Sequence, residues 1–343
     1  YTAAHWPMHA RERDIEKYAG RYAAGYDAVR RARYGRMLEE GVVSAANATL
    51  VPLPAGLGET GDLWAWDQRN MEVFAAMVDC MDRGIGRIVE AIDAIGQTDN
   101  TLVCYLQDNG GCAETIGRAA VKPGGDAPLP RRPQAPTLPP QPAGMLQPDM
   151  IPRQTRDGFP MRVGQGVMAG AGDTFVAYGE AWSTVSNTPF RRHKHWVHEG
   201  GISTPLVVHW PRGVTRPGRL VHTPGHLVDV MATVIELAGA RYPADKTPLE
   251  GTSLVPLLAG GAIDRGAIYW EHEGNRAVRE GDWKLVAVHG GPWELYDLST
   301  DRSEQHDASQ RQPDRVRRMA ALWEAYAERA DVADWARIAP AKP

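Results

Sequence analysis

The chain has 343 residues, a formal net charge of −4 and a hydrophobic fraction of 43%, so it can bury one large core or two ordinary ones. Lys and Arg form no stripe paired with aromatic residues, which argues against nucleic acid as a partner. No apolar run approaches the roughly 18 residues of a membrane span. The three cysteines, Cys80, Cys104 and Cys112, fit neither a disulfide framework nor a zinc-binding spacing.

The first 61 residues predict helix followed by loop. Residues 11–40 are highly charged and helical in character, and Gly41 is a plausible helix stop. Residues 50–61 combine prolines with glycines, which is typical of a loop.

The clearest helix follows this loop. Apolar residues recur at alternating spacings of three and four from Met71 to Ile95, which gives the helix one buried face. Asp67 suits the first turn or the N-cap, and Gly96 suits the stop. A coiled coil would show the same spacing, but the pattern is isolated, so we expect a helix packed on a sheet.

The next segment combines a predicted strand with metal-binding chemistry. The apolar run Thr101–Leu106 predicts a buried strand, and Asp108 and Asn109 follow almost directly, before two glycines. These residues are common in turns for conformational reasons alone. A carboxylate and a carboxamide at the end of a strand also offer hard oxygen ligands for Ca²⁺ or Mg²⁺. Both interpretations fit the segment taken alone.

The middle of the chain predicts an α/β fold. Residues 118–165 hold many prolines and little periodicity, so we expect a long irregular surface excursion. Residues 205–210 predict a second buried strand, and residues 227–240 predict a helix. The alternation of strands and helices favours a largely parallel sheet.

A second subdomain is predicted to begin near residue 262, giving domains of 1–262 and 263–343. Short β-like runs between residues 267 and 297 predict a small antiparallel sheet. Pro313 then begins a helix with one apolar face, which we expect to cover the sheet.

A basic segment precedes the second strand. It places Lys194 among several cations and histidines, five residues before Glu199-Gly200-Gly201. A lysine near a divalent cation can neutralise a tetrahedral oxyanion. Charge alone favours a solvated basic loop instead. We expect the histidines of this segment to pack or to support neighbours rather than bind metal; they are His193, His195 and His198.

Over nearly its whole length the chain resembles the sulfatase family of the alkaline-phosphatase-like superfamily, most closely bacterial arylsulfatases. The resemblance implies a mixed or parallel sheet sandwiched by helices, with its N-terminal strands missing here, plus a small C-terminal α+β subdomain. The segments that carry it occur in the family's order: His5-Trp6-Pro7, Thr101–Glu114, Lys194–Pro205, Pro224-Gly225-His226, Leu249–Leu254 and Gly281–Leu285.

The resemblance also implies site roles. Asp108 and Asn109 match the pair that binds the active-site cation, usually Ca²⁺, with Mg²⁺ as the alternative. Lys194 matches the lysine that binds the sulfate group, and His5 matches a histidine near the leaving oxygen. Glu199 matches a structural motif to which we assign no chemistry. Gln107 replaces the family's usual Ser, but an alternating strand turns it away from Asp108.

The family's nucleophile is a formylglycine made within a Cys-x-Pro-x-Arg type motif, and no cysteine here fits that pattern. The resemblance begins after the point where this motif and two further metal-binding aspartates normally occur. We therefore expect a fragment whose missing N-terminal part carries the formylglycine, and we expect the chain alone to be inactive. The intact parent is expected to hydrolyse a sulfuric ester.

Two alternatives stay open: a phosphate or phosphonate ester hydrolase of the same superfamily, and a degenerate oxyanion-binding protein without catalysis. The resemblance implies a small-molecule or carbohydrate sulfate ester as substrate. It also implies a bacterial periplasmic or secreted location, although the chain carries no address. The natural substrate and the oligomeric state do not follow from these residues.

Overall fold

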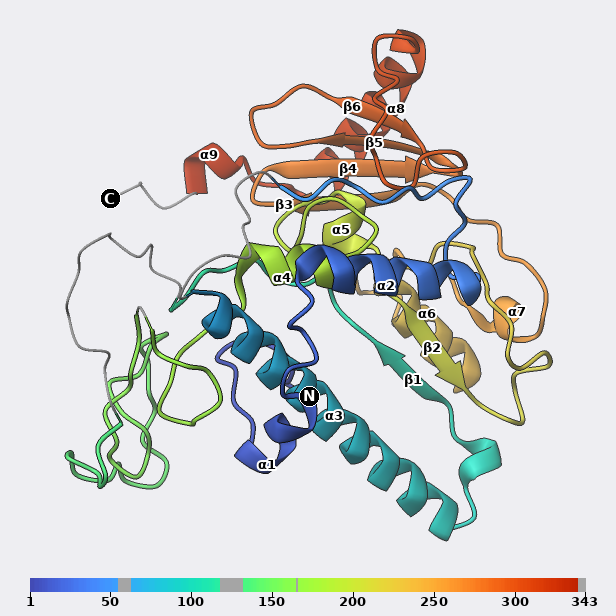
Figure 1. Cartoon of the computed structure of the whole chain (residues 1–343). Coiled ribbons are helices and arrows are strands. Elements are labelled where there is room, and N and C mark those ends of the chain that lie inside the picture. The colour runs from blue at the N-terminus through green and yellow to red at the C-terminus, as the bar shows by residue number, and fades with distance from the viewer. Residues whose placement is uncertain (55–62, 118–131, 165, 339–343) are drawn as a thin grey trace. The chain divides into compact units, whose positions relative to one another are not determined.

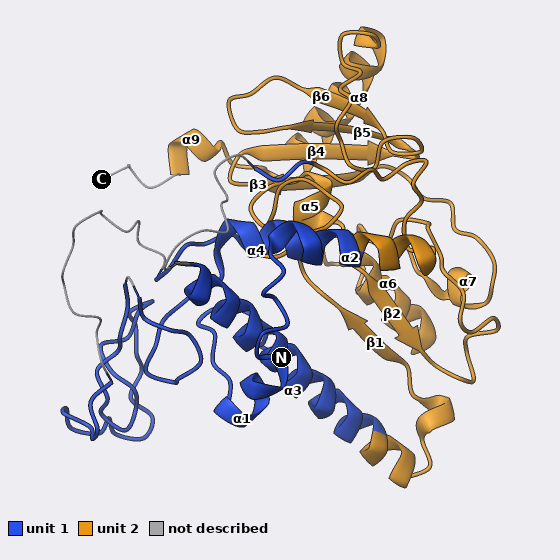
Figure 2. Cartoon of the chain, in the orientation of Figure 1, with its two compact units in different colours: residues 1–33, 52–89, 112–186 blue, residues 34–51, 90–111, 187–343 orange. Residues whose placement is uncertain are grey.

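The computed structural model describes residues 1–54, 63–117, 132–164 and 166–338 (Figure 1). They divide into two compact units (Figure 2). Unit 1 comprises residues 1–33, 52–89 and 112–186, and unit 2 comprises residues 34–51, 90–111 and 187–343. This division differs from the predicted boundary near residue 262, which stays a prediction. Within the described residues, no helix has both the length and the apolar character needed to cross a membrane.

Unit 1 is built from helices around an aromatic core. Its helices are α1 (Glu12–Ile15), η1 (Glu16–Tyr18), the start of α2 (Tyr26–Glu39), most of α3 (Leu63–Ala94) and α4 (Gly179–Ser186). The Trp182 ring is fully buried and lies 4.6 Å from the ring of Tyr26 in an edge-on arrangement, and Trp64 stacks at 6.2 Å. Edge-on and offset aromatic pairs are favourable contacts, so this cluster anchors α2, α3 and α4 to one another.

The predicted long helix is α3, and its start differs from the prediction. It begins at Leu63, so Asp67 lies inside the helix rather than at its cap. The reason is that Trp64 and Trp66 extend the apolar face, and the Trp66 indole nitrogen donates to Val167 O at 2.8 Å. The predicted stop is confirmed, because Gly96 adopts a left-handed φ of +68° two residues after the end of the helix at Ala94.

The proline-rich excursion is confirmed where the structure describes it, since residues 132–164 contain no helix or strand. The parts of this prediction at 118–131 and 165, and most of the predicted loop at 50–61, lie outside the described residues. Helix α4 follows and was not predicted, because it is buried on most sides and lacks the polar face that gives a helical period.

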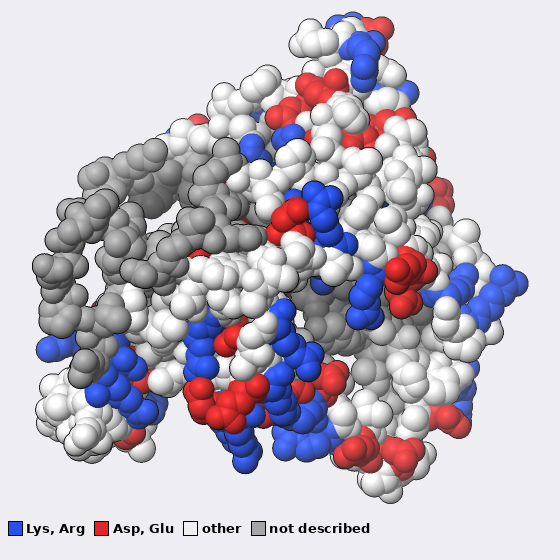
Figure 3. All heavy atoms as spheres, viewed as in Figure 1, with Lys and Arg blue, Asp and Glu red and all other residues white. Residues whose placement is uncertain are grey.

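Charged side chains of both signs mix on the face drawn in Figure 3. In unit 1 several of them form ion pairs across elements, including Arg69 with Glu12 at 2.6 Å and Arg83 with Asp14 at 2.8 Å. Ion pairs that face water each contribute little to stability. The predicted absence of a nucleic-acid partner stays a prediction.

Unit 2 contains the two strands predicted within residues 101–106 and 205–210, which form a two-stranded sheet. They are β1 (Val103–Leu106) and β2 (Leu206–His209), both close to their predicted positions. They pair antiparallel, with Val103 opposite His209 and Leu106 opposite Leu206, so the parallel order inferred from strand–helix alternation is wrong for this pair. The mixed sheet that the resemblance implies as one possibility allows such an antiparallel pair. Both strands are partly exposed within the described chain, and Val207 is 57% exposed, which corrects the prediction of burial.

The C-terminal part of unit 2 confirms the predicted antiparallel sheet and helix. The strands occur in the order β3-β4-β5-β6, and helix α8 (Pro313–Arg329) packs against β4 and β5. Their bounds are β3 Ile268–His272, β4 Asn275–Glu280, β5 Trp283–Ala287 and β6 Glu294–Asp297.

The other face of this sheet covers the segment around Glu199. Val197 and Ile202 pack there with Ala277, Val286 and Tyr296. Because side chains alternate along a strand, Lys284 projects to the same face as Val286. The sheet therefore positions helix α5 (Glu199–Ile202). The remaining helices of the unit are η2 (Thr98–Asn100), α6 (Val228–Leu237), α7 (Val255–Leu258) and α9 (Trp335–Ile338).

Candidate functional site

Asp108 and Asn109 follow the end of β1, where the sequence placed them. Asp108 is exposed and Asn109 is partly buried. The Asn109 amide nitrogen donates to Gly110 O at 2.9 Å, which leaves its Oδ1 for a cation. A carboxylate and an amide oxygen fit part of a Ca²⁺ ligand shell. Gln107 instead bonds Tyr105 Oη at 2.6 Å, on its own side of the strand.

The loop after Asn109 packs against the Glu-Gly-Gly segment with almost no intervening space. The Gly110 N–H donates to Gly201 O at 2.8 Å. A Cβ atom on Gly110 would lie 1.9 Å from Gly200 O, and one on Gly200 would lie 2.2 Å from Arg191 O. These contacts are far below van der Waals distance, so the approach of the two segments requires glycine at position 110, and the close approach of the Arg191 backbone requires glycine at position 200.

Lys194 is tied to the same loop through its backbone. Its N–H donates to Gly111 O at 3.0 Å. The buried Asn187 strengthens this tie, because its Oδ1 accepts from Gly111 N at 2.8 Å while its Nδ2 lies 3.3 Å from Arg192 O. The structure thus joins residues 108–111, named here the Asp108 loop, to residues 187–198, named the Lys194 loop. Asn187 was missed by sequence reasoning, since nothing in its local sequence distinguishes it from a turn residue.

His5 belongs to unit 1, whereas Asp108, Asn109 and Lys194 all belong to unit 2. His5 is exposed, and its Nδ1 donates to Trp6 O at 2.8 Å. In the neutral imidazole this leaves Nε2 as the nitrogen able to accept a proton. The structure therefore brings three of the four predicted site residues into one unit.

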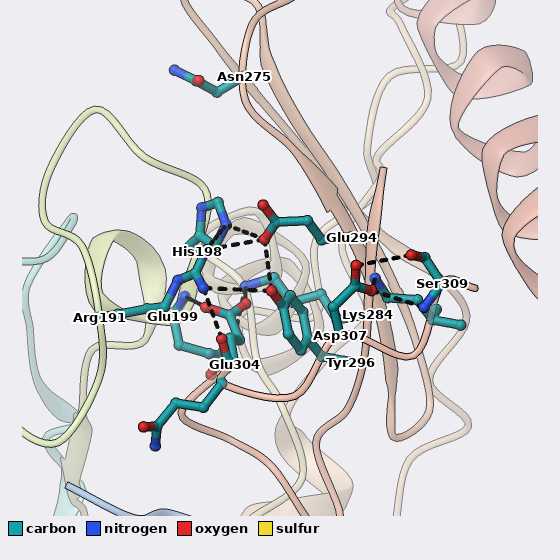
Figure 4. A network of polar contacts seen from close by, with 12 residues as sticks. Arg191, His198, Glu199, Asn275, Lys284, Glu294, Tyr296, Glu304, Asp307 and Ser309 are labelled. Carbon is teal, nitrogen blue, oxygen red and sulfur yellow. Dashed lines mark hydrogen bonds and ion pairs between the residues drawn. The ribbon is translucent and has the colours of Figure 1, made fainter. Parts of the chain in front are cut away.

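A buried ion network supports the Glu199 segment (Figure 4). Lys284 Nζ lies 2.9 Å from Glu199 Oε1 and 2.8 Å from Glu304 Oε1, and all three side chains are almost inaccessible. The Glu199 N–H donates to Glu304 Oε2 at 2.8 Å. Burial alone would raise the pKa of Glu199, but the attraction of Lys284 and Arg302 outweighs it and lowers that pKa. Glu199 is thus a structural anion.

A second polar cluster adjoins this network in Figure 4. Glu294 Oε2 accepts from Tyr296 Oη at 2.6 Å and lies 3.0 Å from Arg191 Nη2 and 3.3 Å from His198 Nε2. The hydrogen bond from His198 and these neighbours lower the pKa of Glu294 to about 2. Burial lowers the pKa of His198, so its ring is neutral near pH 7. His198 therefore packs and supports its neighbours, as predicted.

Asp229 connects two further segments of the resemblance. Its Oδ2 accepts from His226 N at 2.7 Å. Its Oδ1 accepts from Thr252 N at 2.8 Å and from Arg265 Nη1 at 2.6 Å. A fully buried carboxylate needs such partners. Asp229 therefore connects the segment Pro224–His226 to the segment Leu249–Leu254.

Comparison with known families gives two matches. The model of the family described as Sulfatase matches residues 1–240. A second model, described as the C-terminal part of N-sulphoglucosamine sulphohydrolase, matches residues 191–328. The second match covers all of the four-stranded sheet and most of α8.

Individual relatives agree with these matches. The chain is 27% identical to an uncharacterized sulfatase of Schizosaccharomyces pombe, over 95% of this chain and 56% of the relative. It is 28% identical to an arylsulfatase of Klebsiella aerogenes, over 74% of this chain and 49% of the relative. The chain thus spans about half the length of these curated relatives.

Solved structures show the same fold. The crystal structure of Ps i-CgsB matches 95% of this chain and 48% of its own, with a TM-score of 0.56 and 20% identity. The putative sulfatase yidJ of Bacteroides fragilis matches 97% of this chain and 53% of its own, with a TM-score of 0.51 and 14% identity. The α/β fold predicted from the resemblance is confirmed. Since the sulfatase model covers well over half of its residues, the chain belongs to the sulfatase family.

Proposed function

We propose that the intact protein hydrolyses a sulfate monoester in the manner of an arylsulfatase. In this proposal Asp108 and Asn109 supply part of the ligand shell of a divalent cation, Ca²⁺ in preference to Mg²⁺. Lys194 binds the sulfate group, and His5 serves the leaving oxygen. The observation that carries the proposal is the hydrogen bond from Lys194 N to Gly111 O at 3.0 Å, because it holds the Lys194 loop on the Asp108 loop.

Each residue has a definite chemical task in this account. The Lys194 ammonium neutralises charge that develops on the nonbridging sulfate oxygens. The His5 imidazole, once Nε2 has taken up a proton, gives that proton to the departing alcohol oxygen. A divalent cation bound at Asp108 and Asn109 would polarise the ester.

The 343 residues supply only part of the machinery that this reaction needs. Two oxygen donors fall short of the about six to eight that Ca²⁺ prefers. No cysteine in the chain has the formylglycine sequence context, and we place that nucleophile in a preceding segment of the parent. We therefore expect the purified 343-residue chain to show no turnover of a sulfate ester.

The proposed substrate is a small-molecule or carbohydrate sulfate ester. Family membership supports a sulfuric ester in general. Ps i-CgsB was solved in complex with k-i-k-neocarrahexaose, but its identity to this chain is 19%, which supports the fold alone.

Turnover of an aryl sulfate and of the matching aryl phosphate by the intact protein tests this function. We expect the sulfate to react faster, and Lys194→Ala to lower kcat/KM for it by at least a hundredfold. Lys246→Ala is the matched control, since the Lys246 side chain is 63% exposed and lies away from the described site contacts. A preference for the phosphate would indicate the phosphoesterase alternative, and absence of turnover on both would indicate a binding protein.

A further inference from the structure

A cluster of two histidines and one glutamate lies where the Lys194 loop meets the β3–β4 hairpin, all within unit 2. His195 Nδ1 lies 3.3 Å from His272 Nε2 and 3.4 Å from Glu273 Oε2. The three potential ligand atoms all lie within 4.8 Å of one another. His195 comes from the loop, whereas His272 and Glu273 end β3 and begin the turn into β4.

These distances match the donor spacing of a tetrahedral metal site. With bonds of about 2.0–2.1 Å to nitrogen or oxygen, the donors around Zn²⁺ lie roughly 3.3–3.4 Å apart. Two of the three distances between donor atoms in the cluster, 3.3 Å and 3.4 Å, already have this length. The donor set also selects the ion, because imidazole favours zinc and its neighbours over Ca²⁺, which takes oxygen ligands.

One buried side chain holds the two histidine backbones together. Asn275 Nδ2 donates to His195 O at 3.0 Å and to His272 O at 2.9 Å. Its Oδ1 accepts from His289 N at 3.1 Å, so the amide is used at both ends. Metal affinity depends on donors held by such supporting contacts.

The backbone at two of the three donors is unusual. His195 has a φ of +81° and Glu273 a φ of +53°, in the left-handed region that non-glycine residues rarely adopt. Such conformations persist where surrounding contacts determine them, and they are common at ligand sites. Here they direct two side chains from separate segments toward the same point.

We propose that His195, His272 and Glu273 bind one Zn²⁺ or a similar divalent transition-metal ion. The side chains of His195 and Glu273 are each 41% exposed, so the ion would keep a coordination position open to water or an anionic oxygen. It would place positive charge at the residue that follows Lys194. This proposal departs from the sequence-based expectation that His195 packs against its neighbours, and it does not depend on the proposed sulfatase activity.

The test is a competition titration between the full 343-residue chain and a chromophoric zinc chelator. Millimolar Ca²⁺ is present throughout to occupy the hard-oxygen ligands. Because the free thiols Cys80 and Cys104 can also bind zinc, the relevant equivalent is identified by difference between variants. We expect His272→Ala and Glu273→Gln each to weaken one zinc equivalent by at least tenfold.

The matched control is His306→Ala, an exposed histidine of the same unit outside the cluster, and it should bind zinc within twofold of the wild type. Circular dichroism verifies that each variant is folded, and Glu273→Gln changes only an accessible side chain on a turn. Co²⁺ bound to the wild type should show intense visible bands typical of four-coordination, absent in Glu273→Gln. The proposal is wrong if the folded Glu273→Gln chain binds zinc as tightly as the wild type.

Discussion

Lys284 Nζ lies 2.9 Å from Glu199 Oε1 inside unit 2, and this contact joins two segments of the resemblance that are 85 residues apart in the chain. Glu199 begins α5 and is followed by Gly200 and Gly201, which contact the Asp108 loop. Lys284 lies on β5. The C-terminal sheet is therefore a structural support for the loop that follows Asp108 and Asn109.

Removing the Lys284 ammonium from its ion pairs with Glu199 and Glu304 should destabilise the protein severely. Lys284→Met leaves Glu199 and Glu304 buried without their shared partner, and breaking a buried ion pair in this way costs about 3–5 kcal/mol. Urea unfolding of Lys284→Met and of a control variant, Lys246→Met, measures the change in the free energy of unfolding. Lys246→Met, at an exposed lysine, should leave the midpoint unchanged. Equal midpoints for the two variants would show that the network adds nothing to stability.

Stability should fall as the pH drops below about 6.5. Burial holds the pKa of His198 below its ordinary value of 6.5, so below that pH the unfolded chain binds a proton that the folded chain resists. The groups around the ring are Arg191, Lys284, Glu294 and Glu304. Thermal melts between pH 5 and pH 8 measure this, on the wild type and on His198→Gln.

The variant should lose the part of the slope between pH 5 and 6.5 that His198 causes, and an unchanged slope would contradict the assignment.

Glu294 gives a separate signal at lower pH. Its folded pKa of about 2 lies below the ordinary value of 4.5, so its contribution is present above pH 4.5 and is lost as the pH falls toward 2.

Asn187 should be a positioning residue for the candidate site. Asn187→Ala removes the hydrogen bonds that hold Gly111 N and Arg192 O, at a cost of about 1–3 kcal/mol in stability. We expect a larger loss in function, with a rise in the Ca²⁺ concentration that half-activates the intact protein. Asn100→Ala, at an exposed asparagine, is the control. An unchanged Ca²⁺ requirement would assign Asn187 to folding alone.

Glycine at position 110 should be indispensable. Gly110→Ala would place a Cβ atom 1.9 Å from Gly200 O, so the loop bearing Asp108 and Asn109 must move. We expect the melting temperature to fall by several degrees. Gly86→Ala is matched to it, because the space around Gly86 in α3 is open and alanine stabilises a helix interior by about 0.5–1 kcal/mol. We expect Gly110→Ala to lower the melting temperature and Gly86→Ala to raise it. Stabilisation by both substitutions would contradict the packing of Gly110 against Gly200.

Much of the fold could be predicted because its signals are local. The spacing in α3, the short β-like runs at β3 to β6 and the apolar face of α8 can each be recognised within a short stretch of sequence. The start of α3 at Leu63 and the existence of α4 could not be predicted, because both depend on burial among aromatic residues from distant segments. The antiparallel pairing of β1 with β2 is likewise a long-range choice that strand order does not determine.

The site divides in the same way. Asp108, Asn109 and Lys194 could be named because they belong to recognisable motifs, and their roles stay predictions. Asn187 and Glu304 could not be named, since each acts through partners that only the folded chain brings near. His195 shows the limit most clearly: its local sequence indicates packing, whereas its partners are on a hairpin about 80 residues away.

The central claim is that the Asp108–Asn109 loop and Lys194 act on the same sulfate ester. A double-mutant cycle on kcat/KM of the intact protein, with Asp108→Asn and Lys194→Ala, measures this most directly. Residues that act as a unit are strongly non-additive, so the double variant should lose little more than the worse single variant. The pair Asp108→Asn and Lys246→Ala should be additive. Additive losses for Asp108 and Lys194, each large alone, would contradict a shared site.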